Sequence, residues 1–360
     1  MKKILLVIPS LVGGGAERVM TTMANNFCKD CNVEILTLTS KDCFYKLDSR
    51  VKLSNLGCSV NRKNKLTTVF TKLQSAFRGF FGIAKAVKTK KPDTIIAFLG
   101  SVISPLVILK ALGLIKSQVI VSERADPTVR SKFSQWFERT FYPKADIIVC
   151  QAEQVKMLFD EKYREKCIVI PNPISADAIP PVYTGERRKI VVGVGRLAPQ
   201  KNFSLLIKAF SRLPADFDEY KLQIYGGGPY ESTLNKQIEV LNMQDRITLM
   251  GIKKNVMFEI ADAELFVMSS NYEGFPNALV ESMATGLPVI STDFSTGVAH
   301  EIIGDKNGIV IPVGDEDALV AAMTELLSDP QRRAEMSVEN RKYLDKLSED
   351  TVMTYWKNII

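Results

Sequence analysis

Two glutamates eight residues apart, Glu273 and Glu281, are the residues of this sequence whose spacing points most directly to chemistry. Glu273 follows an apolar run that ends at Met268, and Glu281 falls inside a helix expected from about Asn277. The unpaired N–H groups at such a helix start bind phosphate, and the two carboxylates can accept hydrogen bonds from hydroxyls on either side of it. The pattern therefore favours a site that binds a sugar nucleotide. The alternative is that Glu273 is an ordinary loop carboxylate and Glu281 a solvated helix residue, and that neither binds a ligand.

Two cations, Arg196 and Lys201, follow a strand-like run at 190–194 and precede a helix that Asn202 is expected to cap. Both side chains are predicted to face the same ligand and to bind its diphosphate. A charged hydrogen bond contributes roughly 1.5–3 kcal/mol, so losing either cation should weaken the complex by about ten- to a hundredfold. Surface charge flanking the helix is the alternative interpretation.

Glycines follow strand-like runs in both halves of the chain. The loop 13–15 comes directly after the run 3–8 and lets a ligand approach the backbone closely, unless it is a tight turn without a ligand. Arg18 stands where a dinucleotide-binding fingerprint has its third glycine, which disfavours a dehydrogenase. In the C-terminal half, Gly251 and the run 226–228 leave room for a flat base, unless they serve packing alone.

The size and composition of the chain limit the possible folds. A length of 360 residues and a mass of 40.1 kDa exceed what one hydrophobic core usually supports, so two domains are expected. The N-terminal run is too short for a secretion signal, and no apolar stretch reaches membrane-spanning length. The six cysteines and the single histidine are spaced unlike a zinc site, which predicts free thiols in a reducing cytoplasm.

Strand-like runs alternate with helical patterns along the chain, which predicts parallel sheets covered on both faces. A proline-rich linker at 171–185 divides the runs into two series. We therefore expect an α/β protein of two doubly wound, Rossmann-like domains that face a cleft. The predicted units are residues 1–175, residues 176–345, and a terminal helix at 346–360 that packs back toward the N-terminal domain.

Two motifs resemble those of a known family. Gly-Arg-Leu followed by Lys-Asn occurs within 191–202, and Glu-Gly-Phe-Pro-Asn followed by Val-Glu-Ser-Met-Ala-Thr-Gly-Leu-Pro-Val-Ile occurs within 273–291. In this order they resemble the retaining glycosyltransferases of GT-B fold that use nucleotide-sugar donors, among them the N-acetylgalactosaminyltransferases of bacterial lipid-linked glycan assembly. The likeness covers essentially the whole chain, with acceptor binding in the first domain and donor binding in the second.

The resemblance also implies roles for single residues. Arg196 and Lys201 would bind the diphosphate and stabilise it as it departs, Glu273 would contact the transferred sugar, and Glu281 would bind the ribose. The remaining donor contacts would come from small or loop residues, namely Gly14, Gly15, Gly274, Phe275, Pro276 and Asn277. The resemblance further implies retention of anomeric configuration and no metal or other cofactor. The acids at 315–317 are interpreted as a helix cap.

One position departs from the family pattern. Many relatives have a histidine after the fourth strand of the N-terminal domain, where this sequence has Arg124. Arginine stays protonated and cannot act as a base, which puts the role of that histidine in doubt here. Arg124 is a candidate for binding an acceptor phosphate or supporting the sugar. Glu123 and Asp126 are candidate acceptor-side carboxylates, with a loop salt bridge as the alternative.

The stretch 62–91 carries nine cations, and no acidic residue occurs between Arg50 and Pro92. Its apolar residues recur at helical spacing, which is typical of a helix on an anionic membrane surface, where each cation contributes about 1 kcal/mol. Residues 1–175 contain 28 basic and 14 acidic side chains, against 19 and 26 in the rest, so an anionic partner is expected for the first half. A core-facing helix is the alternative, and nucleic acid is disfavoured because no binding module accompanies the charge.

Together these patterns predict a cytoplasmic glycosyltransferase at the inner face of the membrane. It would transfer N-acetylgalactosamine, N-acetylglucosamine or another hexose from a UDP-sugar to a polyprenyl-diphosphate-linked glycan. Assembly of lipopolysaccharide O-antigen, capsule or glycoprotein glycans is the expected setting. A nucleotide-sugar 2-epimerase of related fold and a non-enzymatic, membrane-docked sensor of sugar nucleotides are the rival hypotheses.

Overall fold

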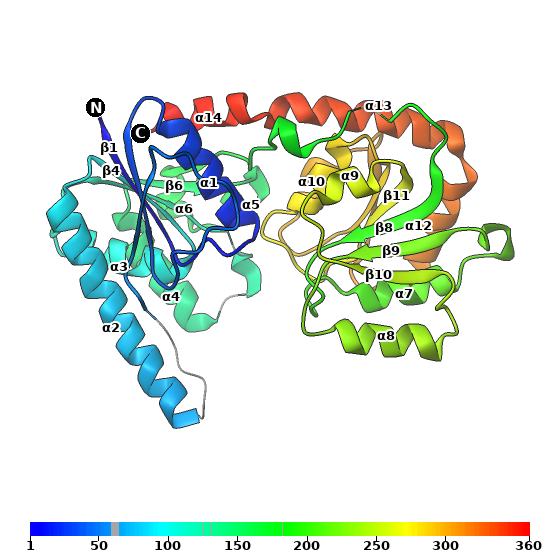
Figure 1. The fold of residues 1–360 in the computed structure, drawn as a ribbon, viewed down its shortest axis with the longest axis horizontal. Coiled ribbons are helices and arrows are strands. Elements are labelled where there is room, and N and C mark those ends of the chain that lie inside the picture. Colours follow the sequence, from blue (N-terminus) through cyan, green and yellow to red (C-terminus); the bar gives the residue numbers. More distant parts are fainter. Residues whose placement is uncertain (59–64, 125, 130, 182) are drawn as a thin grey trace.

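The computed structural model describes residues 1–58, 65–124, 126–129, 131–181 and 183–360, with the side chains at 65–70, 127, 176 and 344 outside that description. The chain forms two α/β domains that lie side by side along the longest axis of the molecule (Figure 1). The two doubly wound, Rossmann-like domains predicted from the alternating pattern are therefore confirmed.

The N-terminal domain is built on a sheet of seven parallel strands in the order β3-β2-β1-β4-β5-β6-β7. These strands are β1 (Lys3–Ile8), β2 (Asn32–Thr37), β3 (Lys52–Asn55), β4 (Thr94–Phe98), β5 (Gln118–Ser122), β6 (Ile147–Cys150) and β7 (Cys167–Val169). The strand order reverses between β1 and β4, and ligands of such sheets bind beyond the carboxyl ends of the strands at that point. β3 was not predicted, because its sequence Lys-Leu-Ser-Asn lacks β-branched and aromatic residues.

Helices cover both faces of this sheet. On one face, α1 (Gly15–Phe27) packs together with α14 (Glu349–Lys357), which returns from the end of the chain. The helices of the other face are α2 (Lys65–Lys90), α3 (Gly100–Ala111), α4 (Lys132–Phe141), α5 (Glu153–Met157) and α6 (Glu161–Arg164). Because both faces are covered, strands β1 and β4 are almost entirely buried.

The C-terminal domain has a sheet of six parallel strands in the order β10-β9-β8-β11-β12-β13. These strands are β8 (Arg188–Val194), β9 (Lys221–Tyr225), β10 (Ile247–Gly251), β11 (Ala263–Met268), β12 (Val289–Thr292) and β13 (Gly308–Ile311). Its helices are α7 (Phe203–Ser211), α8 (Glu231–Val240), α9 (Val256–Ile260), α10 (Asn277–Ala284), α11 (Val298–Ile302), α12 (Glu316–Ser328) and α13 (Pro330–Leu347). α7, α8 and α12 cover one face, and α9, α10 and α11 cover the other.

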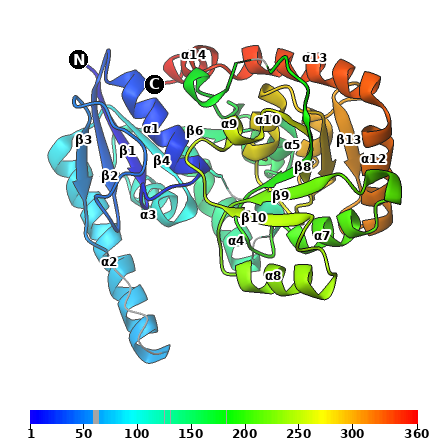
Figure 2. The same cartoon turned by 45° about the vertical axis from the view of Figure 1, so that its right-hand side comes forward.

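The end of the chain ties the two domains together. α13 runs along the C-terminal domain and α14 continues over the N-terminal domain (Figure 2). The indole of Trp356 is fully buried, with its ring centroid 6.1 Å from that of Phe98. Lys357 Nζ also lies 2.9 Å from Asp30 Oδ2. A helix from the end of the chain thus forms part of the core of the first domain.

Two predicted helix caps have different outcomes. Asp315 Oδ1 accepts a hydrogen bond from Ala318 N at 2.9 Å, which confirms the cap of α12. The predicted cap by Asn202 is wrong, because this residue has a left-handed φ of 44° and its amide donates to Asn271 Oδ1 at 3.1 Å.

All six cysteines are free. In the described part of the chain, no helix combines the length and the apolarity needed to cross a bilayer.

Candidate functional site

The loops beyond the carboxyl ends of the strands of both domains meet at the domain junction. Side-chain and backbone hydrogen bonds cross it between Asn172 and Asn277 (2.7 Å), between Thr128 and Ser295 (2.7 Å), and from the N–H groups of Glu153 and Gln154 to Glu301 (3.0 and 2.9 Å). One apolar cluster also extends from the N-terminal domain into the C-terminal one. Of the residues predicted to bind a ligand, Gly15, Arg124, Asn277 and Glu281 have contacts that reach this junction, where the two domains touch directly.

Glu273 lies in the loop after β11 and is buried, with 5% of its surface exposed. Its Oε1 accepts hydrogen bonds from Lys201 Nζ at 2.5 Å and Ser270 Oγ at 2.6 Å, and Gln200 Nε2 lies 3.3 Å from its Oε2. A buried carboxylate is stable only when a cation and further donors surround it, so these contacts fix its orientation. The Lys201 ammonium has three N–H donors. The contact with Glu273 therefore leaves two donors that can bind a phosphate oxygen.

Glu281 lies on α10 and forms an ion pair with Arg18, which belongs to α1 of the opposite domain. The carboxylate of Glu281 is 10% exposed and the side chain of Arg18 is 30% exposed. Burial lowers the pKa of the Arg18 guanidinium from its ordinary value. Because the ion pair engages Oε1 of Glu281, its other oxygen can accept a hydrogen bond from a ribose hydroxyl.

The glycine loop of the N-terminal domain touches the start of α10. Gly13 has a φ of 117°, which favours glycine, and α1 begins at Gly15. A Cβ atom on Gly15 would lie 2.6 Å from Asn277 Nδ2, and one on Gly14 would lie 2.4 Å from Glu17 Oε2. Any larger residue at Gly15 would therefore displace the amide of Asn277.

The loop from Glu273 to α10 contains three of the predicted donor contacts. Gly274 and Pro276 are buried, and Phe275 is half-buried against the apolar cluster that both domains share. Pro276 occupies the position before α10, which has no side-chain cap at its start. The N–H groups of Asn277 and Leu279 in the first turn donate to the carbonyl oxygens of Phe275 and Pro276, both at 3.0 Å. An anion at this helix start would therefore be favoured mainly by the helix dipole.

Arg196 is exposed and makes no hydrogen bond or ion pair with any residue that the structure describes. It follows Gly195, whose carbonyl oxygen would lie 1.8 Å from a Cβ atom on Gly226. Position 226 thus requires glycine, because the backbone of Gly195 packs too closely against it to leave room for a side chain. Gly251 has a φ of 69°, and a Cβ atom there would meet no described atom within 4 Å, which leaves the space beside it open for a flat base.

Arg124 lies beyond β5, with its guanidinium carbon 3.9 Å from the ring centroid of Phe98. One of its nitrogens donates to Asn172, which in turn donates to Asn277 across the junction. Its Nε and Nη2 are buried and have no hydrogen-bond partner among the described residues. Burial lowers the pKa of Arg124 to about 9, so it remains protonated at neutral pH.

Glu123 is oriented differently from its neighbour Arg124. Its Oε2 accepts a hydrogen bond from the hydroxyl of Tyr142 at 2.8 Å, and the residue is 8% exposed. The carboxylate of Asp126 lies 2.6 Å from Thr128 Oγ1 and 3.0 Å from Ser295 Oγ, so the two hydroxyl protons are shared among these contacts and the one between Thr128 and Ser295. Of the predicted acceptor-side residues, Arg124 is therefore the one that is connected to α10, through Asn172 and Asn277.

The chain matches two protein families in succession: Glycosyltransferase Family 4 over residues 13–178 and Glycosyl transferases group 1 over residues 177–343. The chain belongs to the glycosyltransferases. It is 29% identical over 345 residues to a Campylobacter jejuni protein, covering 95% of this chain and 93% of that protein. That relative is the GalNAc-α-(1→4)-GalNAc-α-(1→3)-diNAcBac-PP-undecaprenol α-1,4-N-acetyl-D-galactosaminyltransferase.

Solved structures support the same assignment at the level of the fold. Sucrose-phosphate synthase from Thermosynechococcus elongatus matches this glycosyltransferase with a TM-score of 0.84 at 16% identity, over 100% of this chain and 98% of the other. HepE from Anabaena, in complex with UDP, matches with a TM-score of 0.78 at 16% identity, over 100% and 99% of the two chains. The glycosyltransferase therefore has the predicted GT-B architecture.

Three contributors to the junction of the glycosyltransferase were not predicted from sequence. Arg18 was noted only as a departure from a glycine pattern, yet it pairs with Glu281. Asn172 connects Arg124 with Asn277, and Ser270 donates to Glu273. Asn172 lies in the proline-rich linker, and no local pattern identifies it. A polar residue just beyond a buried strand, such as Ser270, is the kind of signal that could have been used.

Proposed function

We propose that this glycosyltransferase transfers a hexose from a UDP-sugar to a polyprenyl-diphosphate-linked glycan, with retention of anomeric configuration. N-acetylgalactosamine is the proposed sugar, with N-acetylglucosamine or another hexose as further candidates. The observation that carries the proposal is the placement of Lys201, Glu273 and Glu281 around the uncapped start of α10. This arrangement offers one site each for a sugar hydroxyl, a diphosphate and a ribose.

Two similar proteins support the choice of donor and acceptor. The Campylobacter jejuni relative bears a name that specifies a glycan linked to undecaprenol through PP as its substrate. HepE, which shares the fold, was solved in complex with UDP. The proposal extends both features to this chain.

In the proposed reaction, the bond between the anomeric carbon and the diphosphate oxygen breaks, and UDP leaves with the bonding electrons. Arg196, Lys201 and the start of α10 stabilise the negative charge that develops on the diphosphate. The acceptor hydroxyl attacks the same face of the sugar and passes its proton to the departing phosphate oxygen. Glu273 accepts a hydrogen bond from a sugar hydroxyl, and Lys201 joins this carboxylate to the diphosphate. We propose that these groups act without a metal ion.

The test is release of UDP from a panel of UDP-sugars, measured in EDTA with and without an undecaprenyl-diphosphate-linked glycan. We expect release that depends on the acceptor, and a product whose new linkage keeps the anomeric configuration of the donor by NMR. Failure to release UDP from any donor contradicts the proposal. Conversion of the donor sugar without an acceptor indicates the epimerase, and donor binding without turnover indicates the sensor.

We also propose that α2 contacts an anionic membrane surface and locates the enzyme at the inner face of the cytoplasmic membrane. α2 extends beyond the rest of the N-terminal domain, toward the bottom of the view (Figure 1). Leu73, Phe77 and Phe81 are 58, 57 and 63% exposed, and their spacing places them on one side of the helix. A groove of about 680 Å³ lies between this side of α2 and α3. Exposed apolar residues beside cations suit the interface of an anionic bilayer.

Replacing both aromatic residues of α2, in the variant Phe77→Asp/Phe81→Asp, should abolish membrane binding, because two charges replace the apolar side. Co-sedimentation with phosphatidylglycerol vesicles measures the effect, and neutral phosphatidylcholine vesicles should bind the wild type weakly. Phe258→Asp is the matched control, because Phe258 is 48% exposed on the C-terminal domain. Undiminished sedimentation of the double variant would show that another surface contacts the membrane.

A further inference from the structure

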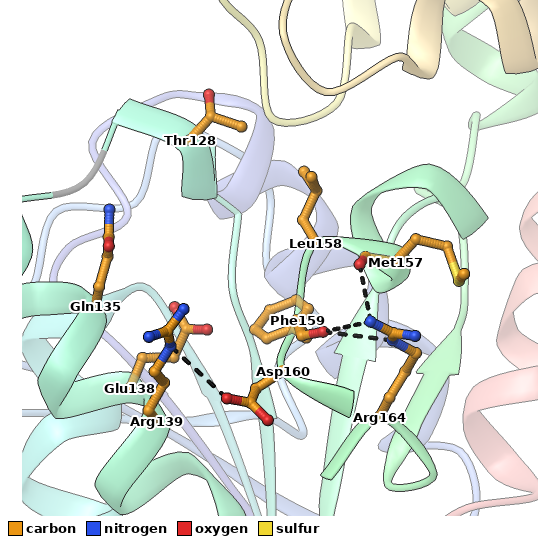
Figure 3. A pocket seen from close by; sticks show the side chains of 9 residues that line it. All are labelled: Thr128, Gln135, Glu138, Arg139, Met157, Leu158, Phe159, Asp160 and Arg164. Carbon is orange, nitrogen blue, oxygen red and sulfur yellow. Dashed lines mark hydrogen bonds and ion pairs between the residues drawn. The ribbon is translucent and has the colours of Figure 1, made fainter. Parts of the chain in front are cut away.

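A second cavity lies in the N-terminal domain, between α4 and the segment that joins α5 to α6 (Figure 3). Its volume is about 360 Å³, within the range of roughly 300–1,000 Å³ found for ligand pockets. None of the donor-binding residues described above belongs to its wall. We call this cavity the α4–α6 pocket, defined by Thr128, Gln135, Glu138, Arg139, Leu158 and Asp160.

The α4–α6 pocket borders the domain junction. Its wall includes Thr128, whose hydroxyl lies 2.7 Å from the hydroxyl of Ser295 in the C-terminal domain. The next residue, Thr296, donates to the carbonyl oxygen of Glu273 at 3.2 Å. Figure 3 shows Thr128 and Leu158 at the end of the pocket that faces the loops of the C-terminal domain. A ligand in the pocket would therefore extend toward the residue proposed to contact the transferred sugar.

The charges of the pocket wall balance one another. Arg139 lies 3.7 Å from Asp160, and Glu138 accepts a hydrogen bond from the hydroxyl of Tyr163 at 2.9 Å. The guanidinium of Arg164 donates to the carbonyl oxygen of Phe159 at 2.9 Å and so fixes the loop that forms one side. Among the described residues of the wall, two basic and two acidic groups balance in charge. Such a wall suits a neutral ligand rich in hydroxyl or amide groups, and does not suit a diphosphate.

The side chains of α4 offer both kinds of contact that a sugar ring makes. Gln135 and Arg139 are planar polar groups one helical turn apart on the pocket wall. Outside the pocket wall, α4 also carries Phe133 and Trp136, which are 71 and 55% exposed, with ring centroids 5.7 Å apart. Aromatic faces pack against the C–H groups of a sugar ring, while amide and guanidinium groups bind its hydroxyls.

We propose that the α4–α6 pocket binds the sugar residues of the acceptor that precede the one being extended, and thereby selects the length of the acceptor glycan. This proposal rests on the proposed function, because it assigns the acceptor of the same reaction to a particular surface. The acceptor's terminal hydroxyl would reach the domain junction past Thr128. Its neighbouring sugars would lie over Gln135 and Arg139.

The test uses the variant Gln135→Ala/Arg139→Ala and lipid-linked acceptors that carry one or three sugars. Losing two hydrogen-bonding groups should raise KM for the three-sugar acceptor by about tenfold. The KM for the one-sugar acceptor, the affinity for UDP and the thermal midpoint should stay unchanged. Lys132→Ala is the matched control, because it removes an exposed cation at the start of the same helix without altering the pocket. An equal change for both acceptors, or no change, overturns the proposal.

A binding measurement separates this proposal from the proposed reaction. Trp136 is one of two tryptophans, and the other, Trp356, is fully buried, so fluorescence quenching by a ligand reports on α4. A lipid-free N-acetylgalactosamine trisaccharide should quench the wild type with saturation and the double variant with about tenfold weaker affinity. Quenching without any transfer would retain the pocket and reject the reaction. Transfer without a saturable signal would retain the reaction and reject the pocket.

Discussion

Replacing Lys201 by methionine is expected to lower kcat by about a hundred- to a thousandfold, the cost of losing one group that stabilises charge in the transition state. The ammonium of Lys201 is the cation that contacts both the buried carboxylate of Glu273 and, in the proposed complex, the departing diphosphate. The measurement is single-turnover release of UDP at saturating donor and acceptor.

The same substitution should also destabilise the fold, because it leaves the carboxylate of Glu273 buried without its cation. Breaking a buried pair on one side costs about 3–5 kcal/mol, and the hydrogen bonds from Ser270 and Gln200 place this site at the lower end of that range. The double variant Lys201→Met/Glu273→Gln removes both charges and should regain most of the stability. Its kcat should remain low.

An exposed ion pair provides the control for Lys201. Lys189 pairs with Glu219 on the surface of the same domain, and Lys189→Met should change neither stability nor kcat. If Lys201→Met retains the wild-type kcat, or if the double variant recovers it, then Lys201 does not stabilise the leaving group.

Replacing Arg18 by alanine is expected to weaken the binding of UDP by about tenfold, which corresponds to the loss of one charged hydrogen bond. The ion pair of Arg18 with Glu281 joins α1 to α10 across the domain junction and holds the carboxylate that is proposed to bind the ribose. Without Arg18, this carboxylate loses its fixed orientation, and the contact between the domains is weakened. Isothermal titration with UDP measures the effect.

A double-mutant cycle separates this role from a general loss of stability. If Arg18 acts through Glu281, the variant Arg18→Ala/Glu281→Gln should bind UDP no more weakly than Glu281→Gln alone. Arg212→Ala is the matched control, because Arg212 pairs with Glu316 and Asp317 within the C-terminal domain. Additive losses in the cycle would show that Arg18 and Glu281 act independently.

The fold was accessible from sequence because long parallel strands have continuous apolar runs, as in β1 and β4. β3 is short and polar and lies at the edge of its sheet, so neither its composition nor its pattern distinguishes it from a loop. The cap predicted at Asn202 failed because its amide bonds to Asn271, a partner distant in sequence. Local sequence patterns therefore predicted the two sheets, whereas features that depend on long-range contacts, such as the side-chain bond of Asn202, could not be predicted.

The site could be predicted only in part, because some of its contacts join residues that are far apart in the sequence. The spacing of Glu273 and Glu281 around a helix start is local, and the structure has that helix beginning at Asn277. The direct contact of Lys201 with Glu273 joins residues 72 positions apart, and the pair of Arg18 with Glu281 joins two domains. Neither contact follows from spacing. The separate predictions that Lys201 binds the diphosphate and Glu273 binds the sugar remain predictions.

A crystal structure of the enzyme with bound UDP tests the central claim most directly. We expect the diphosphate within hydrogen-bonding distance of Arg196, Lys201 and the first turn of α10, and the ribose hydroxyls on Glu281. UDP bound away from these residues, or no binding at concentrations that saturate turnover, would contradict the account.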